Sequence, residues 1–169
     1  MNTTVDFQNE IDAPVEINRL EQAIQITLER FAGHALRAGI PADDLELAVV
    51  ITTDEQVQQL NVEFRQVDAP TDILSFPADP LPIEFSDEPY YLGDLIIAYP
   101  YALAQATRLG HDPLENLCLL VIHGCLHLLG YDHDTVENRR KMWEAQAEIL
   151  QALNISTAIV PELESAPHE

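Results

Sequence analysis

Three histidines in one short stretch of the chain have the spacing of a metal site. His123 and His127 are four residues apart. On an α-helix, two residues at this separation lie roughly 40° apart around the axis and about 6 Å apart along it, so both imidazoles can reach one ion. Gly130 favours the left-handed turn that ends a helix, which lets the chain return His133 to the same point. The pattern therefore predicts a metal centre with His123, His127 and His133 as ligands.

The chemistry of three imidazoles favours zinc as the metal. Neutral imidazoles suit Zn²⁺, and a site with three protein ligands keeps a fourth position for water, as catalytic zinc sites do. We therefore expect one zinc ion per chain. The alternative is that His123 and His127 are ordinary helix histidines and that Gly130 only ends the helix, and three histidines at matched spacing disfavour it.

The same spacing, H-x-x-x-H-x-x-G-x-x-H, occurs in the long motif of zinc proteases, with one difference. Gly124 stands where those enzymes carry their glutamate base. A metalloprotease interpretation must therefore supply another base. A third interpretation, a non-catalytic assembly factor with structural zinc, requires a fourth protein ligand, and His111 is the candidate.

The composition is that of one globular domain. The chain has 169 residues, 47% of them hydrophobic, which is enough to bury a core without disulfides. Its two cysteines, Cys118 and Cys125, fall in one apolar segment and are interpreted as core residues. We find no apolar run of membrane-spanning length and no signal-peptide pattern, so we expect a cytoplasmic protein with no membrane partner.

The net charge limits how the chain can bind nucleic acid. It is -21, with only eight Lys plus Arg, whereas general affinity for phosphates normally comes from a basic face. Any RNA contact must then rest on the metal and on a few placed cations. The candidates are Arg65 and the run Arg139-Arg140-Lys141, and the run is more simply a solvated helix face.

Hydrophobic periodicity predicts the elements that position these residues. Strands are expected at 5–8, 45–52, 72–77 and 91–99, and helices at 15–38, 53–65, 100–109, 114–129 and 134–153. The first helix should end at Gly39, and the last should begin with a capping box formed by Asp134 and Glu137. Residues 78–89, rich in proline and acids, are interpreted as a mobile flap or a hairpin connection.

This order predicts an α+β fold, with a mixed sheet of about four strands covered by about five helices. The first helices should make parallel crossovers, and the third and fourth strands should pair antiparallel. The helix that carries His123 and His127 should pack across one face. We expect a single domain at 1–153, followed by an acidic and flexible tail at 154–169.

Four segments together resemble the YbeY family of bacterial endoribonucleases. They are Asn61-Val-Glu-Phe-Arg65, Thr71-Asp-Ile-Leu-Ser-Phe-Pro77, Leu92-Gly-Asp-Leu95 and His123-Gly-Cys-Leu-His-Leu-Leu-Gly-Tyr-Asp-His133. The resemblance implies a zincin-like α+β domain with zinc held by His123, His127 and His133. It also implies a single-strand-specific endoribonuclease that acts in 16S rRNA 3′-end maturation and ribosome quality control. Gly124 then follows the family's pattern, and Arg65 is implied to work in the active cleft.

For RNA cleavage, the metal would polarise a phosphoryl oxygen or activate a water, while Arg65 would hold the phosphate. Asp132, beside the third ligand, would orient a histidine or act as the base, unless it only caps a turn. Without the resemblance, Arg65 would be interpreted as a surface residue at the end of its helix. The expected partners are ribosomal RNA and either small-subunit proteins or an assembly GTPase, because so acidic a chain needs help to hold RNA. DNA is not expected as a partner.

Overall fold

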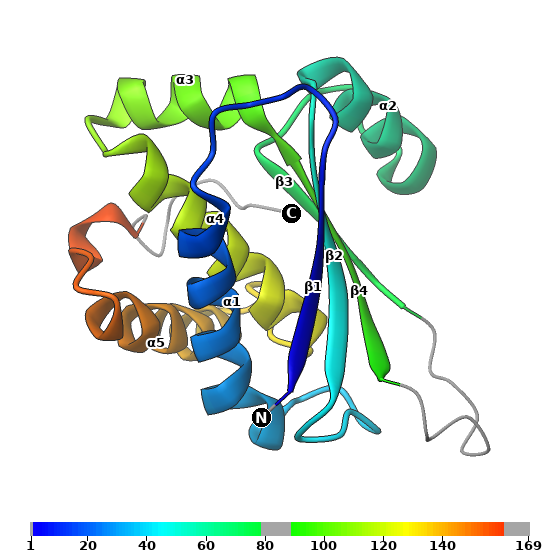
Figure 1. Ribbon diagram of the computed structural model, residues 1–169, viewed down its shortest axis with the longest axis vertical. Coiled ribbons are helices and arrows are strands. Elements are labelled where there is room, and N and C mark those ends of the chain that lie inside the picture. The colour runs from blue at the N-terminus through cyan, green and yellow to red at the C-terminus, as the bar shows by residue number, and fades with distance from the viewer. Residues whose placement is uncertain (1, 79–88, 161–169) are drawn as a thin grey trace.

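The computed structural model describes residues 2–78 and 89–160, which form a mixed four-stranded sheet with helices on both faces (Figure 1). The strand order across the sheet is β1-β2-β4-β3. The first three strands in this order run parallel, and β3 pairs antiparallel with β4. The strands are β1 (Thr3–Asn9), β2 (Leu45–Thr52), β3 (Ile73–Pro77) and β4 (Tyr90–Ala98). The predicted mixed sheet, the parallel crossover between β1 and β2 and the antiparallel pairing of β3 with β4 are confirmed. The parallel crossover predicted for the second helix is wrong, because that helix leads from β2 to β3, an edge strand that runs antiparallel to β2 and β4.

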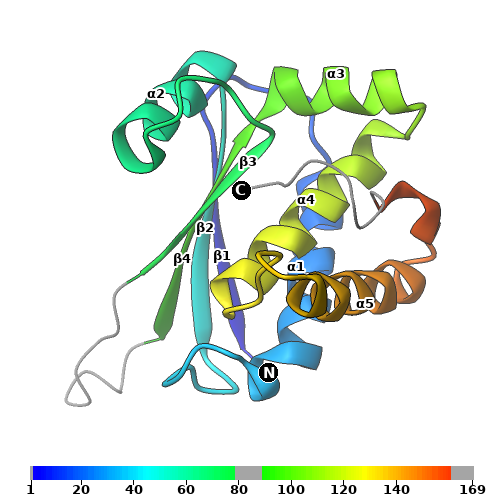
Figure 2. The same ribbon diagram turned by 180° about the vertical axis from the view of Figure 1, so that it is seen from behind.

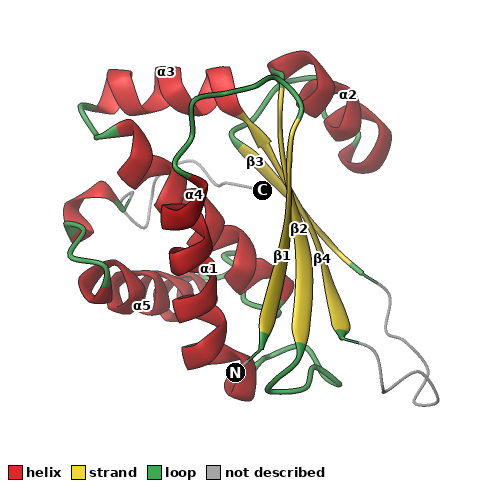
Figure 3. Cartoon of the chain, in the orientation of Figure 1, coloured by secondary structure: helices red, strands yellow, loops and turns green. Residues whose placement is uncertain are grey.

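The described residues form five α-helices, as predicted. They are α1 (Ile17–Phe31), α2 (Asp54–Arg65), α3 (Tyr99–Leu109), α4 (Pro113–Leu128) and α5 (Val136–Ala152). α1, α4 and α5 lie on one face of the sheet and enclose the main core, whereas α2 covers part of the other face (Figure 3). Under α2 lies a smaller cluster built around Val57, Leu74 and Ile96. None of the helices in the described ranges combines the length and the apolar character needed to cross a lipid bilayer.

The helix α4 is the centre of the main core. Asp112 caps its first turn by accepting a hydrogen bond from the Glu115 amide at 3.0 Å. The helix packs closely on the sheet at Gly124, where a Cβ would lie 2.7 Å from Leu95 Cδ2 and 3.2 Å from Ile73 Cδ1. A residue with a side chain would therefore push α4 away from β3 and β4. The glycine that replaces the protease glutamate thus serves helix packing.

Two predicted helix boundaries are wrong, and tertiary contacts explain both. α1 ends at Phe31, followed by a short 3₁₀ turn, because the next segment leaves the helix to bind α4: the amides of Leu36 and Arg37 both donate to the Leu129 carbonyl, at 2.9 and 3.0 Å. α5 is capped by Thr135, which accepts from the Asn138 amide at 3.0 Å. The predicted capping residue, one position earlier, instead accepts from the Asn138 side chain.

The packed part of the chain extends beyond the boundary expected at residue 154. Ile155 and Ile159 are buried in the main core, the second within a short 3₁₀ helix at Thr157–Ile159. Within the described residues, the packed chain therefore extends to Val160. The predicted flap at 78–89 falls almost entirely outside the described residues, as does the rest of the expected tail. Cys118 and Cys125 are buried and unbridged, as predicted.

Candidate metal centre

The fold brings the three predicted histidines to one point. His123 and His127 project from the last turns of α4, and His133 reaches them from the loop that follows. One nitrogen from each ring lies within 4.8 Å of the others. The ring centroids are 4.6 to 5.6 Å apart. Three imidazoles at this separation can bind one ion.

A tight turn at Gly130 returns the chain to the centre. Gly130 has φ +101°, and a Cβ at this position would lie 2.5 Å from the Arg37 backbone nitrogen. Glycine is therefore required both by the left-handed backbone and by the close approach of the segment that follows α1. The amide of Tyr131 donates to the Leu126 carbonyl at 3.0 Å and closes the turn. The position of His133 thus depends on packing between distant parts of the chain.

Hydrogen bonds fix the tautomers of the two helical histidines. Nδ1 of His123 lies 2.6 Å from the side-chain oxygen of Gln146, and Nδ1 of His127 lies 3.0 Å from the Tyr131 carbonyl. Both oxygens are acceptors, so both Nδ1 atoms carry the proton and donate it. Each Nε2 then presents a lone pair, and the two Nε2 atoms are only 3.1 Å apart. Facing lone pairs repel each other, and a bound cation removes this repulsion, so the donor set fits a metal ion.

The electrostatics of the site keep His127 neutral. Burial, and after it the neighbouring His133, lower the pKa of His127 to about 4 against the opposing effect of Asp132. His127 is therefore neutral near pH 7, which is the form that binds metals. His123 is 2% exposed and so is enclosed by the core.

The helix α5 contributes two residues that sequence reasoning did not assign to the site. Gln146 is buried and holds His123. Trp143, one turn earlier, meets the rings of His123 and His133 edge on at 5.9 and 6.0 Å. The available signal was a glutamine within the apolar stripe of the last helix. That stripe alone does not show which polar residue faces a histidine.

Arg65 is the last residue of α2 and lies at the free edge of β3. Its Nη2 donates to the Ser75 carbonyl at 2.7 Å, and its Cζ lies 5.3 Å from the centre of the Phe76 ring. Its positive charge contributes to the lowered pKa of His127. The structure thus brings Arg65 close enough for its field to act on the metal centre.

Asp132 is exposed and accepts a hydrogen bond from the backbone amide of His133 at 2.7 Å. This hydrogen bond therefore positions the backbone of the third ligand, whereas the two helical imidazoles are held by Gln146 and the Tyr131 carbonyl. Asp132 is not part of the cluster of ligand atoms.

His111 does not provide a fourth ligand. It precedes α4, and His123 lies about 15 Å along the axis from the start of that helix. Within residues 2–78 and 89–160, the metal-ligating cluster consists of the three histidines alone. An open fourth position is typical of catalytic metal sites. Together, the α+β fold and the three-histidine centre define a metal-dependent hydrolase.

Comparison with known proteins identifies the family. The family model "Endoribonuclease YbeY" matches residues 6–154. Curated relatives of that description include one from Roseiflexus sp. strain RS-1, 40% identical over 90% of this chain and 94% of its own length. Another, from Chloroflexus aggregans, is 38% identical over 92% of this chain and 99% of its own. The solution structure of TM1509 from Thermotoga maritima shares the fold, with a TM-score of 0.54 and 22% identity over 89% of this chain and 91% of that one.

The chain belongs to the YbeY family of endoribonucleases, which is involved in 16S rRNA maturation. The family, the α+β fold and the metal-dependent endoribonuclease activity predicted from the sequence are confirmed.

Proposed function

We propose that this chain is a zinc-dependent endoribonuclease that cleaves single-stranded RNA in the cytoplasm, in 16S rRNA 3′-end maturation and in ribosome quality control. The observation that carries the proposal is the pair of Nε2 atoms 3.1 Å apart, both with proton-bearing Nδ1 atoms on the far side of the ring. This arrangement is built for a cation. Family membership supplies RNA as the substrate.

Zinc suits this donor set better than the hard divalent cations. Three imidazoles are borderline ligands that Zn²⁺ accepts readily, whereas Mg²⁺ and Ca²⁺ prefer oxygen ligands. When bound, zinc would supply Lewis-acid stabilisation of a phosphoryl oxygen and a water of lowered pKa. His123, His127 and His133 would hold it. Gln146 and the Tyr131 carbonyl keep the two helical rings in the required tautomer.

Arg65 is proposed to hold the phosphate that is attacked. Its guanidinium is anchored to the Ser75 carbonyl and its charge acts on His127, so a planar cation that suits phosphate oxygens is held near the metal centre. The anchor also places the charge before the substrate arrives, which avoids a reorganisation cost during reaction. Arg65 therefore orients the phosphate and neutralises the charge that develops on its oxygens.

Asp132 is proposed to position the third ligand. Its bond to the His133 amide fixes the backbone at that residue, and its exposed carboxylate, whose charge acts on His127, is proposed also to take a proton from an attacking water. These two roles differ in their dependence on charge. Asp132→Asn retains a hydrogen-bond acceptor for the amide but cannot act as a base, so it separates them.

The acidic composition supports a role for partners. With a net charge of -21, the chain is repelled by RNA at long range. We propose that small-subunit proteins or an assembly GTPase bring it to its site on ribosomal RNA, and that Arg65 and the metal act only at short range.

The test is to incubate zinc-loaded protein with labelled single-stranded RNA, double-stranded RNA and peptides, with His127→Ala prepared in parallel. We expect the wild type to bind one zinc per chain by elemental analysis and to cleave single-stranded RNA only. His127→Ala should lose both the zinc and the cleavage. Equal RNA cleavage by His127→Ala would show a contaminating nuclease, and cleavage of peptides alone would favour the protease interpretation.

A further inference from the structure

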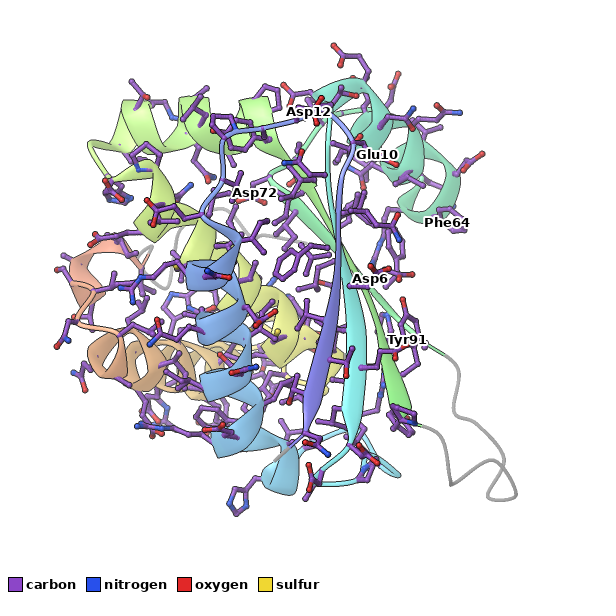
Figure 4. The ribbon with its side chains drawn as sticks, viewed as in Figure 1. Asp6, Glu10, Asp12, Phe64, Asp72 and Tyr91 are labelled. Atoms are coloured by element: carbon purple, nitrogen blue, oxygen red, sulfur yellow. The ribbon has the colours of Figure 1, made fainter. Side chains whose placement is uncertain are left out.

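An exposed phenylalanine lies beside Arg65, across β3 from the metal centre. Phe64 exposes 60% of its surface, and Figure 4 shows it at the outer rim of α2. Its ring meets Phe76 edge on, with centroids 5.4 Å apart and 66° between the planes. The guanidinium of Arg65 lies over the same Phe76 ring. We call these three residues, Phe64, Arg65 and Phe76, the aromatic platform.

Hydrogen bonds fix the turn at the end of α2, which carries Phe64 and Arg65 of the platform. Gln66 takes the left-handed conformation, with φ 58°, and ends the helix directly after Arg65. Asn61 is 3% exposed, accepts from the Val67 amide and donates its side-chain amide to the Ala69 carbonyl at 2.9 Å. The last turn of α2 is therefore tied to the segment that follows it. A surface fixed in this way loses little conformational entropy when a ligand binds.

Phe64 contributes less to the core than its size allows. The inner face of α2 is filled by Val57 and Leu60, whereas Phe64 stands outside with two more exposed apolar side chains, Val62 and Val67, at 44% and 45%. Val62 lies two residues before Phe64 and so on a different side of the helix, but Phe64 pairs with the partly exposed ring of Phe76, and an exposed aromatic pair beside a cation is a candidate binding surface. The platform is thus an apolar patch with one cation at its edge.

The chemistry of the platform matches an unpaired nucleotide. Proteins bind single-stranded nucleic acid by stacking bases on aromatic side chains and on arginine planes, with positive charge beside the backbone. β3 is an edge strand that carries Ile73 against Gly124 of α4 and Phe76 in the cluster under α2, and Figure 2 shows α2 and α4 on opposite sides of the sheet. A protein ligand could bind the apolar surface, but the position of that surface near the metal centre would not favour its binding. A single-stranded RNA substrate can stack on the aromatic rings and also reach the metal centre.

We propose that the aromatic platform binds one base of the single-stranded RNA substrate, with the base stacked on Phe64 and an adjoining phosphate on Arg65. The strand then crosses the free edge of β3 to the metal centre. This inference rests on the proposed function, and it gives that function a source of selectivity. In a duplex, neighbouring base pairs cover the faces of each base, so only unpaired RNA can stack on Phe64.

The test measures binding and cleavage separately on the full chain. A labelled single-stranded oligoribonucleotide is titrated with zinc-loaded wild type, Phe64→Ala, Phe64→Leu and Phe64→Trp, with fluorescence anisotropy as the readout. The control is Leu109→Ala, a similarly exposed apolar residue on α3. Thermal unfolding of each variant confirms that it is folded. A parallel titration uses the same oligonucleotide with single abasic positions.

We expect Phe64→Ala to weaken binding by about 5- to 150-fold, the range that follows loss of an aromatic partner for one stacked base. Phe64→Leu should weaken it similarly, Phe64→Trp should retain it, and Leu109→Ala should bind as wild type. One abasic position should weaken wild type but not Phe64→Ala, because both changes remove the same stack.

Unchanged affinity in both Phe64→Ala and Phe64→Leu would overturn the inference. If those variants instead lose only their association with small ribosomal subunits, the platform binds a protein and the inference is again wrong. The proposed function is tested separately, by cleavage that depends on His127 and is measured independently of Phe64. If the wild type bound no single-stranded RNA, both the proposed function and this inference would be wrong.

Discussion

Gly124 allows a direct test of how closely the metal-bearing helix must approach the sheet. In Gly124→Ala the new Cβ would lie 2.7 Å from Leu95 Cδ2, so that side chain must move by about 0.7 Å to reach ordinary contact, which begins near 3.4 Å. Leu95 is fully buried, and Ile73 on the next strand is crowded too. Overpacking of this kind costs about 1–3 kcal/mol. Alanine in mid-helix recovers about 1 kcal/mol relative to glycine.

We therefore expect Gly124→Ala to be about 1 kcal/mol less stable than wild type, which lowers the melting temperature by about 2–4 °C for a chain of this size. The assay is urea and thermal unfolding followed by circular dichroism. The matched control is Gly33→Ala in the short turn after α1, where a Cβ meets nothing within 4 Å. It should be neutral or stabilising by about 0.4–1 kcal/mol.

An increase in stability for Gly124→Ala as large as that for Gly33→Ala would refute the reasoning, because α4 and the sheet would then leave space for a Cβ at position 124. The same geometry predicts that Gly124→Glu, which restores the protease residue, destabilises the protein and yields no peptidase. Its side chain would start against Leu95 and Ile73.

Three further predictions concern the supports of the site. Gln146→Leu should weaken metal affinity by about 10–100-fold, measured by competition with a chromophoric chelator, whereas Gln146→Glu keeps the acceptor for His123 Nδ1 and should bind at least as tightly. Gly93→Ala should lower the melting temperature more than Gly124→Ala, because φ is +142° and the Cβ would strike the Phe76 carbonyl, a fixed backbone atom. Thr53→Ala removes the cap of the helix that carries Arg65 and should cost about 1 kcal/mol in urea unfolding, with RNA cleavage reduced if the end of α2 moves. Weaker metal binding by Gln146→Glu would contradict the contact with His123. Wild-type stability of Gly93→Ala would contradict the close approach to the Phe76 carbonyl, and wild-type stability of Thr53→Ala in urea would contradict the helix cap.

The sequence predicted the parts of the molecule that local pattern determines. The spacing of His123 and His127 is a property of any helix, and Gly130 has few uses outside a tight turn, so the ligand cluster could be anticipated before the fold. The strand pattern likewise followed from β-branched runs such as Leu45–Thr52.

The remaining features depend on contacts between distant segments. Gln146 faces His123 only because α5 packs beside α4, and no spacing rule relates the two residues. The end of α1 is set by Leu129, nearly a hundred residues later, where propensity alone favours a longer helix. Gly124 was first interpreted as the absence of a base. Its packing role became visible only with the sheet in place, because the partner side chains, Ile73 and Leu95, come from β3 and β4.

The last prediction addresses how so acidic a protein holds RNA. If Arg65 neutralises one phosphate, its contribution to the salt dependence of single-strand binding is a slope of about -0.7 in log affinity against log salt. Arg65→Ala should therefore flatten that slope by about 0.7, whereas Phe64→Ala should weaken binding at every salt concentration and leave the slope unchanged, because stacking releases no counterions. Anisotropy titrations at several salt concentrations measure both. A wild-type slope that Arg65→Ala does not change would place the phosphate contact elsewhere, and a change in slope in Phe64→Ala would mean that Phe64 acts only by holding Arg65 in place.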